Sequence, residues 1–173
     1  MKNLLSGILN LGAVVAMVAV PMYAYAAQEQ RQVIDEQREQ AHCLAQNIYF
    51  EARGSNFADK VSVADVVLNR VQDTRYPNTI CEVVYQGRQD ANGNMIRHQC
   101  QFSWSCDGKS DVAADEDLWQ EALLISWNMV HHGRYRGLTE GATHYHATYV
   151  NPRWARDLQL VGRIGAHIYY RWE

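Results

Sequence analysis

The chain contains the stretch Asn47-Ile48-Tyr49-Phe50-Glu51-Ala52-Arg53-Gly54. Leu44, Ile48 and Glu51 lie at i, i+4 and i+7, so in a helix they share one face and the acid continues an apolar stripe. Gly54 is a natural stop for this helix. A carboxylate partly withdrawn from water at the negative end of a helix is expected to have a raised pKa, which suits a general acid. The alternative is a structural Glu at a helix end, paired with Arg53.

The N-terminal segment has the features of an export signal. Lys2 precedes an apolar stretch over residues 4–20, and Ala24-Tyr25-Ala26 fits a cleavage site of small residues. The apolar stretch is close to the minimum length for crossing a bilayer. We therefore predict a signal peptide or N-terminal membrane anchor over residues 1–26, and a protein exported to the periplasm or the extracellular space, either released or tethered through residues 4–20.

The rest of the chain is predicted to form a spacer and one domain. Residues 27–41 are almost entirely polar and predict a helical linker. Residues 42–173 are long enough for a single domain with its own core. The net charge of −3, from 16 basic and 19 acidic residues, argues against a nucleic-acid-binding protein.

Four cysteines are an even number in a chain predicted to be exported, which favours two disulfides. Three pairings are possible, and we favour Cys81–Cys100 with Cys43–Cys106. The cysteine spacing does not match a zinc-binding motif, because no pair of cysteines is separated by two residues.

Periodicity and capping residues predict a mostly helical α+β domain with one or two hairpins or a small sheet. Asn56 is expected to cap a second helix, and Thr79 a short third helix. Asn92-Gly93 is a hairpin turn signal. Residues 115–132 show the clearest helical pattern, and residues 143–150 alternate as a strand does.

A glycosidase usually pairs a protonated carboxylic acid with a second carboxylate. The candidates for that second group are Asp65, Asp107, Asp111 and Glu140, and none stands out. A mechanism with one carboxylate would explain this, because a hydroxyl of the sugar itself can replace water as the nucleophile. Glu51 would then act first as acid and afterwards as base.

Several residues are candidates for substrate contacts. His144 and His146 lie on one face of the predicted strand, where they could bind zinc with Glu51 or His167 as a third ligand. Aromatic rings offer apolar faces to a pyranose. Trp104 and Tyr145 are the favoured platforms, ahead of three further aromatic residues, Trp154, Tyr85 and Tyr49. Hydrogen bonds to sugar are expected from Gln101, Ser103, Thr143, His144 and His146.

Taken in order, several blocks of the sequence resemble the cell-wall hydrolase family typified by the spore-cortex-lytic enzymes SleB and CwlJ. The similarity covers about residues 43–170. The matching blocks include Glu-Ala-Arg-Gly at 51–54 and Leu-Asn-Arg-Val at 68–71, together with residues 76–86, 100–104, 141–147 and 152–155.

The resemblance implies a lysozyme-like α+β domain that acts on peptidoglycan between N-acetylmuramic acid and N-acetylglucosamine, as a hydrolase or as a lytic transglycosylase that leaves a 1,6-anhydromuramyl end. Glu51 matches the catalytic acid of the family. We expect a monomer without cofactor or metal. Two alternatives remain: a metal-dependent amidase or peptidase using His144 and His146, and a wall-binding module without activity.

Overall fold

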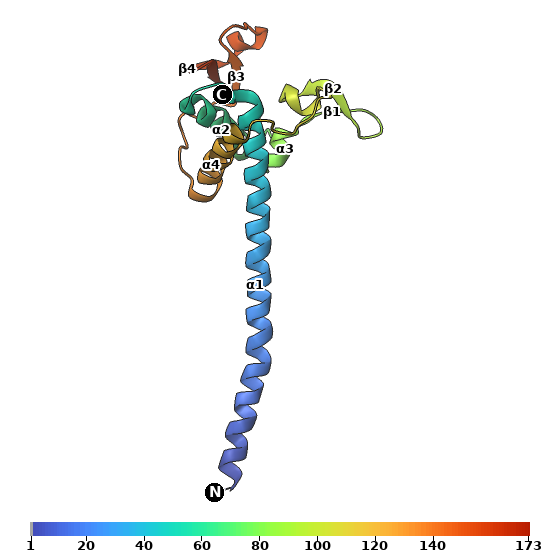
Figure 1. Ribbon diagram of the computed structural model, residues 1–173, viewed down its shortest axis with the longest axis vertical. Coiled ribbons are helices and arrows are strands. Elements are labelled where there is room, and N and C mark those ends of the chain that lie inside the picture. Colours follow the sequence, from blue (N-terminus) through green and yellow to red (C-terminus); the bar gives the residue numbers. More distant parts are fainter. Residues whose placement is uncertain (1) are drawn as a thin grey trace. The chain divides into compact units, whose positions relative to one another are not determined.

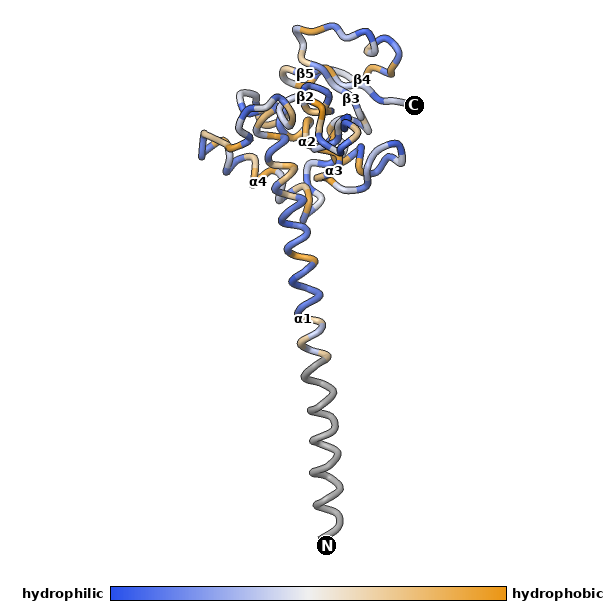
Figure 2. Tube along the Cα trace, turned by 90° about the vertical axis from the view of Figure 1, so that its right-hand side faces the viewer, coloured by the Kyte–Doolittle hydropathy of each residue, from blue (hydrophilic) through white to orange (hydrophobic). Residues whose placement is uncertain are grey.

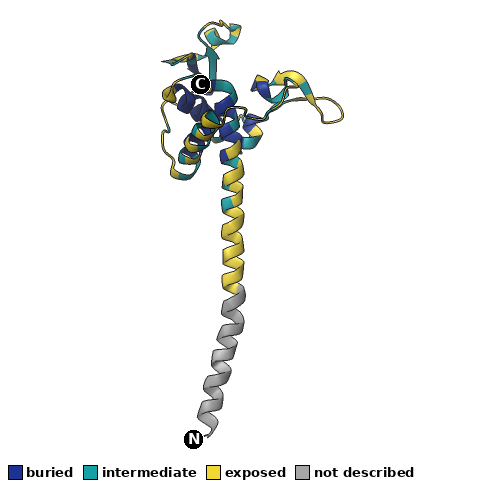
Figure 3. Ribbon diagram, in the orientation of Figure 1, coloured by how far each residue is buried: buried dark blue, intermediate teal, exposed yellow. Residues whose placement is uncertain are grey.

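A computed structural model describes the backbone of residues 2–173 and the side chains of residues 22–173. The chain divides into two compact units, Met1–Gln37 and Arg38–Glu173, and helix α1 (Lys2–Ala52) runs through the boundary. Residues 28–37 of this helix are mostly polar, apart from Val33 and Ile34, and mostly exposed (Figures 2 and 3). The predicted membrane segment, residues 4–20, lies outside the residues whose side chains are described. Among the described residues, no helix combines the length and apolar character needed to cross a membrane.

The second unit contains the end of α1, three further helices, two 3-10 turns and two small antiparallel sheets (Figure 1). This architecture confirms the predicted mostly helical α+β class. In chain order the elements after α1 are α2 (Phe57–Gln72), α3 (Ile80–Val84), β1 (Gly87–Gln89), β2 (Met95–Cys100), η1 (Ser103–Cys106), α4 (Glu116–His132), β3 (His144–Ala147), η2 (Arg153–Asp157), β4 (Gln159–Ile164) and β5 (His167–Arg171).

The helices begin and end where the capping residues predict. The side chain of Asn56 accepts a hydrogen bond from the amide of Asp59 at 2.9 Å, and Thr79 accepts one from Glu82 at 3.2 Å. Helix α4 ends at Gly133, whose φ of 60° lies in the left-handed region that glycine adopts easily. Local chemistry therefore fixes most of the helix boundaries.

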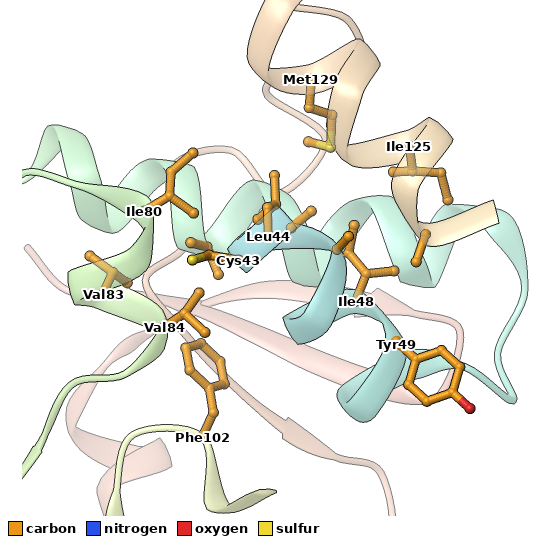
Figure 4. Packing of buried hydrophobic residues seen from close by; sticks show 14 of the residues in the cluster. Cys43, Leu44, Ile48, Tyr49, Ile80, Val83, Val84, Phe102, Ile125 and Met129 are labelled. Carbon is orange, nitrogen blue, oxygen red and sulfur yellow. The ribbon is translucent and has the colours of Figure 1, made fainter. Parts of the chain in front are cut away.

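The main core surrounds the last turns of α1. Leu44 and Ile48 are fully buried, and side chains from α2, α3 and α4 pack around them, including Val83, Ile125 and Met129 (Figure 4). The predicted apolar stripe of α1 is thus buried on all sides. This packing holds the C-terminal end of α1, and with it Glu51, in a fixed position.

Strands β3, β5 and β4 form a sheet in that order. Tyr145 pairs with Tyr169, and His144 pairs with Tyr170. Because side chains alternate along a strand, Tyr145, His167 and Tyr169 share one face of this sheet, whereas His144, His146 and Tyr170 share the other. The sheet therefore separates two groups of aromatic and histidine side chains.

The predicted disulfide pairing is wrong. Cys43 is bonded to Cys81, and Cys100 is bonded to Cys106. The first bond joins α1 to α3, which pack side by side in the core. The second closes the short connection from β2 into η1. The spacing of cysteines along the chain does not reveal which helices become neighbours, and this is why the pairing could not be deduced from it.

Candidate active site

Glu51 lies in the last turn of α1, at the edge of the core. Its side chain is partly buried, and its Oε2 accepts a hydrogen bond from the hydroxyl of Tyr145 at 3.1 Å. Burial raises the pKa of Glu51 above its ordinary value. The hydrogen bond from Tyr145 and the positive charges of His167 and Arg70 act in the opposite direction but do not cancel this effect.

A cavity of about 460 Å³ opens beside Glu51. Four residues that the sequence predicted as substrate contacts line the same cavity: Gln101, Ser103, Tyr145 and His146. Of the described residues that line it, Glu51 alone carries a carboxylate. The structure thus brings together one acid, several hydrogen-bonding groups and a space large enough for a small ligand.

The four alternative carboxylates lie elsewhere and have other partners. Asp65 is fully buried, paired with Arg136 at 2.6 Å and hydrogen-bonded by the backbone and side chain of Thr139. Asp107 accepts a bond from the amide of Lys109 within a turn, and Glu140 is exposed in a turn with φ of 49°. Asp111 lines a different cavity. None of them lies among the residues described as lining the Glu51 cavity.

Trp104 is placed differently from its predicted role. It is 8% exposed, stacks on Phe50 with ring centroids 4.8 Å apart, and donates from its indole nitrogen to Asn47 at 3.3 Å. The side chain therefore supports the helix that carries Glu51 and does not line the cavity. Tyr49 is also buried, and its hydroxyl accepts bonds from the amides of Ala114 and Asp115 just before α4.

Thr143 and His144, which the sequence also predicts as substrate contacts, are not among the described residues that line the cavity. Thr143 is buried, and its carbonyl accepts a bond from Arg70 at 2.7 Å. The ring of His144 lies between Trp154 and Trp172, with centroids at 5.5 and 5.7 Å. Burial lowers the pKa of His144 to about 4, and the charges of Arg70 and Arg75 add to this shift, so this ring is neutral at neutral pH.

The two histidines of β3 are engaged in other contacts. His146 donates from Nδ1 to the carbonyl of Ala147 at 2.9 Å, because a carbonyl can only accept, and its Nε2 shares a hydrogen bond of 3.1 Å with the hydroxyl of Tyr170. The Nδ1 of His144 is within 3.0 Å of the Thr143 hydroxyl. Across residues 22–173, no three His, Cys, Asp or Glu side chains are grouped as a metal site requires. The geometry thus gives no support to the zinc alternative.

Arg70, His167 and Tyr149 line the cavity. The sequence does not predict them as sugar contacts, and it offers His167 only as a third zinc ligand. Arg70 is 5% exposed, and its guanidinium lies over the rings of Tyr76 and Phe102 at 5.3 Å from each. Its Nη1 is buried with no hydrogen-bond partner among the described residues. The ring contacts hold the guanidinium of Arg70 in place, and its positive charge lowers the pKa of Glu51.

His167 and Tyr149 are the other two cavity residues that the sequence does not predict as sugar contacts. His167 is held by Asp59, whose Oδ1 is 2.8 Å from Nδ1, and its ring meets Tyr145 edge-on with centroids 5.0 Å apart. Burial acts to raise the pKa of Asp59, but hydrogen bonds, first of all from His167, lower it overall. Tyr149 is 89% exposed at the cavity. No local sequence signal marks these residues, because they reach the cavity only through the tertiary packing.

Comparison with known proteins identifies the family. The sequence profile of a family described as Cell Wall Hydrolase matches residues 54–170, which is more than half of the chain. The chain belongs to the cell wall hydrolase family. Glu51 lies three residues before the matched range, so its role depends on the geometry described above. As a member of this family, the chain is an enzyme.

Relatives of this cell wall hydrolase include spore cortex-lytic enzymes. The one from Bacillus subtilis strain 168 is 40% identical over 126 residues, which cover 73% of this chain and 35% of the relative. The one from Bacillus cereus is 25% identical over 128 residues, covering 73% and 42%. The chain thus spans less than half the length of these relatives.

The fold matches solved catalytic domains of SleB. The domain from Bacillus anthracis, described as a germination-specific lytic transglycosylase, superposes with a TM-score of 0.57 at 24% identity, covering 76% of this chain and 93% of that one. The domain from Bacillus cereus gives a TM-score of 0.56 at 25% identity, covering 76% and 89%. The similarity includes the mostly helical domain with small sheets.

Proposed function

We propose that this cell wall hydrolase cleaves the glycan strands of peptidoglycan between N-acetylmuramic acid and N-acetylglucosamine, as a lytic transglycosylase. The single observation that carries the proposal is the isolation of Glu51. It is the one carboxylate among the described residues of the cavity, and burial raises its pKa. Family membership and the named activity of the Bacillus anthracis domain support the same chemistry.

Glu51 acts first as a general acid. The Tyr145 hydroxyl donates to Oε2, so the proton of the neutral acid resides on Oε1 and is free to be transferred. Glu51 gives this proton to the glycosidic oxygen, and positive charge builds on the muramyl ring as the bond breaks. The Tyr145 hydrogen bond then stabilises the carboxylate that remains.

The second half of the reaction needs a nucleophile. An inverting or retaining glycosidase would use a second carboxylate, and the described lining of the cavity offers none besides Glu51. The muramyl 6-hydroxyl therefore attacks the anomeric carbon within the same sugar, and the Glu51 carboxylate takes the proton that this hydroxyl loses. The product is a 1,6-anhydromuramyl end, and Glu51 is protonated again for the next turnover.

The other cavity residues bind and orient the sugar. Gln101 and Ser103, which line the cavity, offer hydrogen bonds to the sugar, whereas both ring nitrogens of His146 already have partners within the protein. The ring of Tyr149 is exposed and free to stack on a pyranose. Trp104, which is buried against Phe50, is not part of this contact surface.

The cell wall lies outside the cytoplasm, and the location of the enzyme follows from the substrate. Two disulfides agree with an oxidising compartment. We propose that residues 1–26 direct export and are either removed or retained as an anchor, that residues 27–41 act as a linker, and that the enzyme works as a monomer on peptidoglycan.

The test is the substitution Glu51→Gln, which keeps the shape of the side chain and removes the transferable proton. We expect the rate of release of soluble fragments from purified sacculi to fall by about a thousandfold or more, because general acid catalysis and the return of the proton are lost together. The melting temperature should stay within a few degrees of the wild-type value.

Glu140→Gln is the matched control, because Glu140 is an exposed carboxylate in a turn and does not line the cavity. It should digest sacculi at the wild-type rate. If Glu51→Gln and Glu140→Gln were equally active, Glu51 would not be the acid.

A further inference from the structure

A second cavity of about 380 Å³ lies next to the Glu51 cavity and has no part in the chemistry above. Phe50 lines both cavities, and Glu51 follows it directly in the chain. We name the second one the Trp119 cavity, after the aromatic residue of α4 that lines it together with His42, Gln46, Phe50, Asp111, Val112 and Glu116. The two spaces are therefore neighbours that share one aromatic wall.

The Trp119 cavity follows one side of helix α1. His42, Gln46 and Phe50 are spaced four residues apart, so they lie on one face, and His42 is about 12 Å along the helix from Phe50. A ligand that fills the Glu51 cavity and continues past Phe50 runs along this row of side chains. The arrangement suits an extended ligand with repeating units, such as a polymer.

The lining of the Trp119 cavity has the chemistry that binds sugars. The rings of His42 and Trp119 meet edge-on with centroids 5.3 Å apart, which provides aromatic surface for the C–H side of a pyranose. Asp111 provides a hydrogen-bond acceptor for hydroxyl groups. Burial and the charge of Asp107 raise the pKa of Asp111, so its ionised form gains from a donor such as a sugar hydroxyl.

We propose that the Trp119 cavity binds sugar units of the same glycan strand, next to those held at Glu51. This inference rests on the proposed function and extends it with a second binding site. The glycan backbone of the strand fits the site better than a stem peptide does, because its lactyl carboxyl groups are amide-linked to the peptides and carry no charge, whereas Asp111 and Glu116, which both line the cavity, repel the free carboxylates that peptides carry. The enzyme thereby holds a long strand on both sides of Phe50.

The experiment measures binding without cleavage, in the Glu51→Gln background. The ligands are glycan oligosaccharides of one to four disaccharide units whose lactyl carboxyl groups are capped as methylamides, titrated by calorimetry. The added change is His42→Ala, at an exposed position where the fold does not depend on the side chain. We expect about three- to tenfold weaker binding of the longest oligosaccharide and less than a twofold change for a single disaccharide. His42→Phe, which keeps an aromatic ring, should restore the affinity.

Phe57→Ala is the matched control, because Phe57 is a 48% exposed aromatic residue at the start of α2 and lines neither cavity. It should leave all affinities unchanged. Equal losses for short and long glycans, no loss at all, or a His42-dependent affinity for free stem peptide would each overturn the inference. If the affinity for long glycans depends on His42 but the wild-type enzyme releases no glycan fragments, the proposed cleavage activity is wrong, whereas the proposed binding site is supported.

Discussion

The hydroxyl of Tyr145 donates a hydrogen bond to the Glu51 carboxylate and thereby shifts the pKa of Glu51. Its hydrogen bond lowers the pKa of Glu51, against the larger raising effect of burial. In the proposed mechanism Glu51 acts in its protonated form, so activity should be lost as the pH rises through this pKa. Tyr145→Phe removes a lowering contribution, and the alkaline limb of the pH–rate profile should therefore move to higher pH.

The same substitution should also reduce the maximal rate, by about 10- to 100-fold, because the carboxylate left after proton transfer loses a hydrogen bond to a charged group. Both effects are measured in one profile of kcat against pH on sacculi. An alkaline limb that stays in place or moves to lower pH in Tyr145→Phe would contradict the assigned role.

A substitution of Tyr149 tests whether an exposed aromatic ring stacks on the sugar in the Glu51 cavity. Its ring is 89% exposed at the Glu51 cavity, and the folded core gains little from it. Tyr149→Ala should raise KM for glycan about three- to tenfold by removing a stacking surface, with kcat within twofold of wild type and an unchanged melting temperature. Tyr135→Ala, at a residue 43% exposed and outside the cavity, is the control and should have wild-type kinetics.

At this scale the sequence singles out Glu51 but not the residues that surround it. Glu51 was recognisable because a helical stripe is a local pattern that includes Leu44 and Ile48. Arg70 and His167 reach the cavity from α2 and β5, and their arrival depends on how these elements pack. The sequence favours Trp104 as a sugar platform because polar residues flank it. In the structure its side chain is buried and stacks on Phe50.

At the scale of elements, the Cys43–Cys81 disulfide fixes the helix that carries Glu51. It joins α1 to α3 across a sequence separation of 38 residues, whereas Cys100–Cys106 closes a separation of 6. From the entropy of the closed loops, we expect the paired substitution of Cys43 and Cys81 by serine to reduce the free energy of unfolding by about 4 kcal/mol, against about 2 kcal/mol for the other pair.

Urea unfolding followed by circular dichroism measures both values under the same conditions. The pair Cys100 and Cys106 serves as the control for loss of a disulfide as such. A larger loss of stability from the short loop than from the long one would contradict this order.

Elements with local signals were predicted well. Asn56 and Thr79 cap helices as expected, and Asn92-Gly93 forms the turn between β1 and β2. Strand β4 was missed. It is an edge strand with no fully buried residue, and its register against β5 shifts between Leu160 and Gly162, so it shows neither a clean alternation nor an apolar run. The disulfide pairs were predicted wrongly, since only the packing of α1 on α3 brings Cys43 and Cys81 together.

At the scale of the whole molecule, the second unit, Arg38–Glu173, contains the complete Glu51 cavity and the Trp119 cavity. Both are built from the end of α1 and the elements that pack on it. A polymer substrate explains why two adjacent spaces share the wall of Phe50, and a single acid explains the chemistry without a second carboxylate.

The masses of the products test this account most directly. Purified sacculi are digested with the wild-type enzyme, and the soluble fragments are analysed by mass spectrometry beside a Glu51→Gln digest. We predict muropeptides that end in 1,6-anhydromuramic acid, 18 Da lighter than their hydrolysed counterparts because no water is added, and their absence from the Glu51→Gln digest. Fragments with reducing muramyl ends, or free stem peptides with intact glycan, would contradict the account.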